Sequence, residues 1–116
     1  MNSKNRLFLF WKVGRIVFTK HNQVENIAFK ISSFYSYRYG FDYTFSIENV
    51  NRMKCFYLCF PNYNSTIEKL SWDHYLQLIE IMDRNKRLFY FKISVFCNLT
   101  IEELLFSFDN LFYERL

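Results

Sequence analysis

The sequence predicts an all-α fold: a compact bundle of six or seven helices that contains a helix-turn-helix-like pair. Apolar residues recur at helical spacing along most of the 116 residues, and residues that cap helix N-termini precede several of these segments. With only two Gly and one Pro, the chain carries few helix breakers. We expect a single helical domain over residues 1–116, because a chain of this length has room for one and shows no repeat or linker.

The first predicted helix runs from Ser3 to about Thr19. It is apolar over most of its surface, with Lys12, Arg15 and Thr19 at helical spacing as a narrow polar stripe. A helix with so wide an apolar surface is expected to be central or to lie at an interface.

The next two helices form the helix-turn-helix-like pair. Val24–Tyr39 has an apolar face and ends at Gly40, a residue suited to the position after a helix. About six residues later Ser46 caps a third helix, which Pro61 stops. The polar outer face of this third helix matches a recognition helix.

Residues that cap helix N-termini divide the second half of the chain into several predicted helices. Ser65 and Thr100 each begin a capping box, in which a hydroxyl and a carboxylate three residues later satisfy backbone N–H groups. The helices expected here are Trp72–Ile81 after Ser71, Arg84 to about Phe96 after Asp83, and Ile101 to the C-terminus after Thr100. The alternative for Phe89–Phe96 is a strand, because its Phe, Tyr, Ile and Val residues suit a sheet.

Charge is unevenly distributed along a chain of net charge +4. Nine Lys and Arg stand against three acidic residues up to Lys54, and six against eight from Cys55 onward, so the halves carry +6 and −2. A basic half of this kind suits a polyanion such as nucleic acid. The alternative is that these basic residues only form the solvent-exposed faces of helices and bind no polyanion.

The three cysteines are an odd number and contain no CxxC pair, which favours a reducing, cytoplasmic setting. Cys55 and Cys59 could serve a zinc ion only with two further ligands, so we expect thiols on a helix and neither metal nor cofactor. The apolar run Leu7–Trp11 is far shorter than the ~20 residues of a transmembrane helix. We therefore expect no membrane partner.

Aromatic residues are unusually frequent. The 26 rings carry on the order of 5,000 Å² of surface, more than so small a domain readily buries. Some of this surface is expected to meet a partner, unless the composition only reports coding bias in an AT-rich genome.

Several strings together resemble a known family. Leu70–Tyr75 reads LSWDHY, Arg87–Tyr90 reads RLFY, and Leu111–Leu116 reads LFYERL, while Trp11–Ile16 and Phe45–Tyr57 supply further matches. In order and spacing they resemble the N-terminal domain of bacterial YhcG-type proteins of the PD-(D/E)XK nuclease superfamily. There the corresponding patterns are LSWSHY, ReFY and LyERL.

The resemblance implies a module that precedes a nuclease domain. Such a domain needs an Asp/Glu-x-Lys pair to help hold a divalent ion, and no such triplet occurs in this sequence. We therefore expect no catalytic activity from this chain. It would be a free-standing module, a truncated remnant, or the partner of a nuclease domain on a separate chain.

Seven residues are candidates for nucleic-acid contact. Asn51 and Arg52 could reach base edges from the third helix, where Arg prefers guanine and Asn prefers adenine. The expected phosphate contacts are Lys54, Lys30 and Arg38, with Lys12 and Arg15 extending that surface. Ile47 and Glu48 stand where the family has two basic residues, so the presumed recognition helix has a weaker positive electrostatic potential.

The leading interpretation is a non-catalytic module that binds or targets double-stranded DNA. The alternative is a protein-interaction or oligomerisation module that docks on a separate PD-(D/E)XK nuclease chain or on itself. An independent enzyme is disfavoured because the sequence offers no nucleophile set, and His74 has no nearby Ser or Cys nucleophile with an orienting acid.

Overall fold

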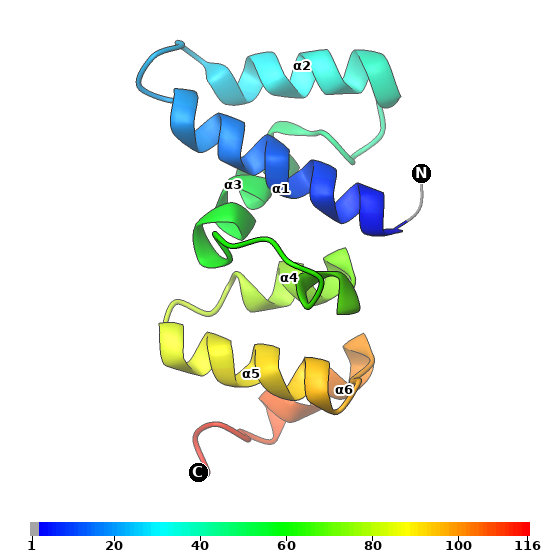
Figure 1. Cartoon of the computed structure of the whole chain (residues 1–116), viewed down its shortest axis with the longest axis vertical. Coiled ribbons are helices and arrows are strands. Elements are labelled where there is room, and N and C mark those ends of the chain that lie inside the picture. Colours follow the sequence, from blue (N-terminus) through cyan, green and yellow to red (C-terminus); the bar gives the residue numbers. More distant parts are fainter. Residues whose placement is uncertain (1–2) are drawn as a thin grey trace. The chain divides into compact units, whose positions relative to one another are not determined.

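The computed structural model describes the backbone of residues 3–116 and the side chains of residues 5–116. Figure 1 shows that this part of the chain is built from helices. In order they are α1 (Ser3–Lys20), α2 (Ile27–Tyr39), α3 (Ile47–Cys59), the 3-10 turn η1 (Ile67–Lys69), α4 (Trp72–Leu78), α5 (Arg84–Phe96) and α6 (Ile101–Asp109). The predicted all-α fold is confirmed. The alternative of a strand over Phe89–Phe96 is wrong, since these residues belong to α5.

Backbone contacts divide the chain into two compact units, Met1–Tyr63 and Asn64–Leu116, called unit 1 and unit 2 below. Unit 1 holds α1, α2 and α3, and unit 2 holds η1, α4, α5 and α6. The charge asymmetry of the sequence follows this division, because unit 1 carries +6 and unit 2 carries −2.

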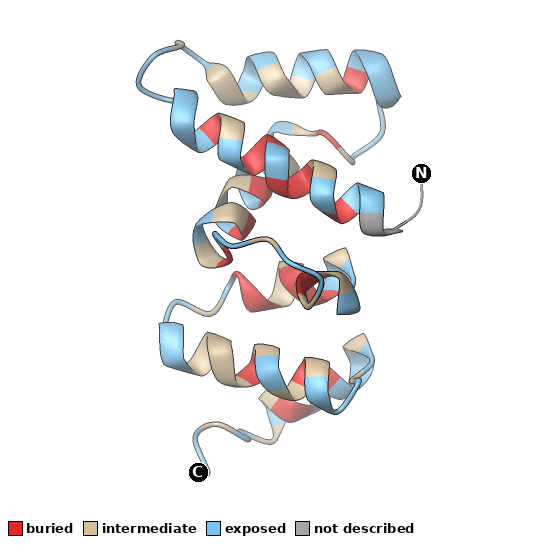
Figure 2. Ribbon diagram, in the orientation of Figure 1, coloured by how far each residue is buried: buried red, intermediate tan, exposed pale blue. Residues whose placement is uncertain are grey.

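Unit 1 is organised around a close crossing of α1 and α3. Gly14 of α1 lies at this crossing, and a Cβ atom there would overlap the carbonyl oxygen of Met53. Glycine is therefore required for the two backbones to approach so closely. In Figure 2 the buried residues of unit 1 concentrate on these two helices; they include Phe10, Val13 and Val17 of α1 and Val50, Met53 and Phe56 of α3.

The second helix contributes less to the core, since only Ser36 of α2 is buried. It begins at Ile27 rather than at the predicted Val24. The reason is Asn26, whose left-handed backbone (φ 56°) interrupts a right-handed helix. Its end agrees with the prediction: Gly40 has φ 119°, and its N–H donates to the carbonyl of Ser36 at 2.7 Å.

Residues 40–46 connect α2 to α3 and supply a core residue, Phe45, which is almost fully buried. Its ring packs against the rings of Phe10, Tyr35 and Tyr39. Ser46 then caps α3 as predicted, with its side chain accepting a hydrogen bond from a backbone N–H of the first turn. The helix-turn-helix character of the α2 and α3 pair stays a prediction.

The capping box predicted at Ser65 is wrong. The backbone makes only the short turn η1, whose N-cap residue, Thr66, forms no side-chain cap hydrogen bond. Instead the N–H of Thr66 donates to Oδ1 of Asn64 at 2.9 Å. An Asn side chain that binds the backbone two residues on favours a turn over a regular helix.

The other helices of unit 2 begin at their predicted caps. Ser71 and Thr100 form capping boxes, and the Asp83 side chain accepts from a backbone N–H in the first turn of α5. This cap and the packing of α5 override the β propensity of its aromatic and branched residues. Two ends differ from the prediction: α4 stops at Leu78, and α6 stops at Asp109 rather than at the C-terminus.

Candidate nucleic-acid interface

All seven residues predicted to contact nucleic acid lie in unit 1. Six of them are exposed: Lys12 and Arg15 on α1, Lys30 and Arg38 on α2, and Asn51 and Arg52 on α3. The seventh, Lys54 of α3, is half-buried. The structure thus places most of the predicted set at the surface of one basic unit.

Aromatic rings contact the two predicted cations of α1. Nζ of Lys12 lies 5.2 Å from the centre of the Phe8 ring, and Cζ of Arg15 lies 5.0 Å from the Trp11 ring. Trp11 is itself anchored, because its Nε1–H donates to the carbonyl of Phe60 at 2.9 Å. A cation–π contact orients a charged group and leaves its other side to solvent, so both exposed charges can still meet a phosphate.

Sequence reasoning missed another ring-bound cation on this helix. Arg6 is exposed, and its Cζ lies 5.3 Å from the Phe10 ring. The available signal was a cation four residues from an aromatic residue, a spacing that places both side chains on one helix face. The same spacing pairs Lys12 with Phe8 and Arg15 with Trp11.

Asp42 and Tyr35 of unit 1 have shifted pKa values. Hydrogen bonds from Thr44 lower the pKa of the Asp42 carboxyl, with a smaller contribution from the charge of Arg6. Burial raises the pKa of the Tyr35 hydroxyl, and the neighbouring Tyr39 adds to that shift. Asp42 is therefore held as a negative charge in the segment between α2 and α3.

The second helix mixes cations with exposed rings. Phe29, Phe34 and Tyr37 are 59%, 61% and 84% exposed, and Lys30 lies among them along the same side of the helix. No acidic residue occurs between Ile27 and Tyr39. α2 therefore presents an aromatic and basic surface.

Of the three DNA-contact residues predicted on α3, only Asn51 and Arg52 lie on the same side of the helix. Lys54 follows Arg52 by two positions, about 200° around the helix, so the two cations point to different sides. Arg52 lies 4.0 Å from the carboxylate of Glu48, and both side chains are well exposed. The outer side of α3 thus offers Asn51 and Arg52, with an acidic group beside them.

His74 has a structural role in unit 2. Its Nδ1 accepts a hydrogen bond from the backbone N–H of Ser71 at 3.2 Å, and its Nε2 lies 2.8 Å from the carbonyl oxygen of Leu99. With Nδ1 as acceptor, Nε2 carries the proton and donates. Nδ1 therefore closes the capping box at the start of α4, and Nε2 holds α4 to the segment that precedes α6.

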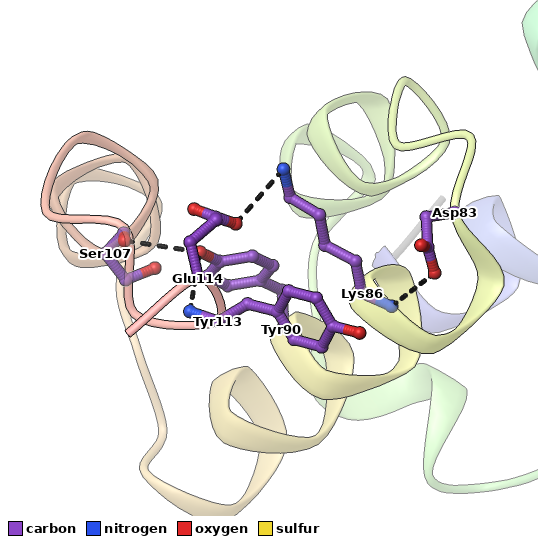
Figure 3. Close-up of polar contacts among 6 residues, drawn as sticks. All are labelled: Asp83, Lys86, Tyr90, Ser107, Tyr113 and Glu114. Carbon is purple, nitrogen blue, oxygen red and sulfur yellow. Dashed lines mark hydrogen bonds and ion pairs between the residues drawn. The ribbon is translucent and has the colours of Figure 1, made fainter. Parts of the chain in front are cut away.

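Two of the strings that carry the family resemblance meet in unit 2, as Figure 3 shows. Nζ of Lys86 lies 3.2 Å from the carboxylate of Glu114, and the Tyr90 hydroxyl accepts from the backbone N–H of Tyr113 at 3.2 Å. These contacts hold the C-terminal segment to α5. A cavity of about 260 Å³ adjoins them, below the ~300 Å³ of typical ligand sites, and we assign it no ligand.

Neither a metal-binding cluster nor a membrane-spanning helix occurs within residues 3–116. In that range no three His, Cys, Asp or Glu side chains gather as a metal ion would require, and Cys55 and Cys59 simply lie one turn apart on α3. Nor does any helix of that range combine the length and the apolar character needed to cross a membrane.

These features define an all-helical protein with two units. The N-terminal unit is basic and exposes aromatic rings, and in the C-terminal unit the RLFY and LFYERL strings are in contact. The family model described as the DUF1016 N-terminal domain matches residues 2–115, so the chain belongs to the DUF1016 N-terminal domain family. No curated protein and no solved structure matches the chain.

Proposed function

We propose that this chain is a non-catalytic DNA-binding module of the kind that precedes the nuclease domain in YhcG-type PD-(D/E)XK proteins. Any nuclease activity associated with it would come from another domain or chain. In this proposal unit 1 binds double-stranded DNA, and unit 2 does not contact it.

One observation carries the proposal: the positive charge of the chain belongs to unit 1. That unit has nine Lys and Arg against three acidic residues, while unit 2 is net negative. Phosphate contacts supply most of the affinity of a non-specific DNA complex, and they need cations at the surface. Exposed cations on α1, α2 and α3 meet that need.

The helices take different parts in this proposal. Lys12 and Arg15 of α1 and Lys30 and Arg38 of α2 would contact phosphates, which fix the position of the protein without reading sequence. Asn51 and Arg52 of α3 would reach base edges. Glu48 beside Arg52 opposes the approach of the DNA backbone, so we expect weak binding.

The test measures the anisotropy of a labelled DNA duplex between ~50 and ~200 mM salt. We expect the logarithm of the affinity to fall linearly with the logarithm of the salt concentration, because binding releases counterions. Replacing two cations together, Arg52→Gln and Lys54→Gln, should weaken binding and make the slope shallower by roughly 1 to 2. Most of that change should come from Arg52, since Lys54 is half-buried on another side of α3.

The matched control removes two exposed cations from α5 of unit 2, Arg84→Gln and Lys92→Gln, for the same change in net charge. The control should keep the wild-type slope. The proposal fails if the wild-type chain is not retained at ~50 mM salt, if its binding does not depend on salt, or if both double variants lose affinity equally.

A further inference from the structure

The chain has two exposed apolar surfaces of opposite charge, and the first of them shares Lys30 with the proposed DNA surface. The first, called the α2 face, consists of Phe29, Lys30, Phe34 and Tyr37. The second is a hollow of about 430 Å³ in unit 2, called the α6 hollow. It is lined by Leu99, Glu102, Glu103, Phe106 and Phe112.

The α6 hollow is apolar inside and acidic at its rim. Phe106 is 60% exposed, and its ring lies edge-on to the Phe112 ring with the ring centres 6.3 Å apart. Glu102 and Glu103 are both exposed in the first turn of α6. A ligand for this hollow would be aromatic or aliphatic and would carry positive charge, because a polyanion would be repelled by the two carboxylates.

The α2 face has the properties that this hollow requires. Its three rings supply the apolar contact, and Lys30 lies among them. We propose that the α2 face docks into the α6 hollow of a second copy of this chain. Rings would then fill the hollow, and Lys30 would approach the carboxylates of Glu102 and Glu103.

Charge favours this pairing over the two symmetric ones. Two α2 faces packed together would bring Lys30 of each copy, and Arg38 nearby, toward their like-charged counterparts. Two α6 hollows would bring four carboxylates together. Like charges opposed across an interface disfavour association, so unlike faces are selected. Such a contact is heterologous, and it either closes into a ring or continues to larger assemblies.

The proposal is tested by light scattering of the full chain over a range of concentrations, without nucleic acid, because Lys30 also belongs to the predicted DNA surface. One helix face in one hollow is a small contact, so we expect a mass that rises above the monomer in the micromolar range. An α2 variant (Phe34→Ser with Tyr37→Ser) and an α6 variant (Phe106→Ser with Glu102→Lys) should each stay monomeric. Circular dichroism checks that both remain helical.

Mixing provides the decisive measurement. The α2 variant keeps an intact hollow and the α6 variant keeps an intact α2 face, so an equimolar mixture should form a dimer with one copy of each. A wild-type chain that stays monomeric, an α6 variant that still associates alone, or a mixture that stays monomeric would overturn the proposal.

Charge reversal tests the same contact while all rings stay in place. Lys30→Glu and Glu102→Lys change exposed residues, so we expect both variants to fold. Each alone should weaken association, and the chain that carries both changes should regain it, because the attraction is restored with opposite signs. Absence of this recovery counts against the proposal. None of these outcomes bears on DNA binding by unit 1.

Discussion

Gly14 sets how closely α1 and α3 approach. A helix interior normally disfavours glycine by roughly 0.5–1 kcal/mol relative to alanine, because glycine loses more backbone freedom on folding. At this position the cost is offset by packing, since even a methyl group would meet the Met53 carbonyl. The residue therefore has a steric role and not a turn-forming one.

We predict that Gly14→Ala destabilises the protein although it raises helix propensity. The added methyl must push α1 away from α3, and overpacking of this kind costs about 1–3 kcal/mol. Urea denaturation should show a lower free energy of unfolding. Ser33→Ala on the exposed side of α2 is the control and should change stability by less than about 0.5 kcal/mol. Equal stability of Gly14→Ala and the wild type would mean that the crossing tolerates a side chain.

Single residues show where sequence reasoning succeeds. The caps at Ser46 and Thr100 depend on contacts three residues away, and both were predictable. The partners of other residues lie far along the chain. Gly14 meets Met53, and His74 contacts the carbonyl of Leu99, 25 residues away. No local pattern reports such a contact.

At the scale of elements, the helical periodicity of α3 predicted much of its pattern of burial. Its periodicity correctly separated buried Val50 and Met53 from exposed Asn51 and Arg52. The start of α2 was not predictable in this way, because apolar spacing continues through Asn26 while the backbone there turns left-handed. Periodicity reports which face of a helix is buried, but its ends depend on single backbone conformations.

We predict that Glu48→Gln strengthens DNA binding and slightly weakens the fold. Removing the carboxylate relieves repulsion of phosphate and releases Arg52 from its ion pair. At low salt the gain is up to about fivefold, from a Coulomb energy of about 1 kcal/mol in water. The cost in stability is about 0.3–1 kcal/mol, because the variant loses the favourable interaction between a negative charge in the first turn and the positive end of the helix dipole.

The control for this prediction is Asp73→Asn. It removes an acidic residue from the first turn of α4, so charge and helix position match while the site lies in unit 2. Anisotropy and urea denaturation are measured on both variants. We expect similar losses of stability and a gain in affinity for Glu48→Gln alone. An equal gain for Asp73→Asn would show that only the net charge of the chain matters.

At the scale of the whole molecule, charge and structure divide the chain in the same way. The sequence showed a basic and an acidic half, but no charged residue lies between Lys54 and Glu68. Charge counting therefore could not place a boundary between Tyr63 and Asn64, where the backbone contacts put it. The contact pattern was needed to assign the whole excess of positive charge to one folded unit.

This assignment predicts that DNA affinity follows the charge of unit 1 at constant net charge. Lys30→Gln with Asp73→Asn keeps the net charge at +4 but takes unit 1 from +6 to +5, and affinity should fall. Glu48→Gln with Lys92→Gln also keeps +4 but takes unit 1 to +7, and affinity should rise. Anisotropy at ~50 mM salt, where the electrostatic contribution is large, compares the two variants with the wild type. Three equal affinities would contradict the prediction and mean that only the net charge of the chain matters, whereas the opposite order of affinities would place the DNA surface in unit 2.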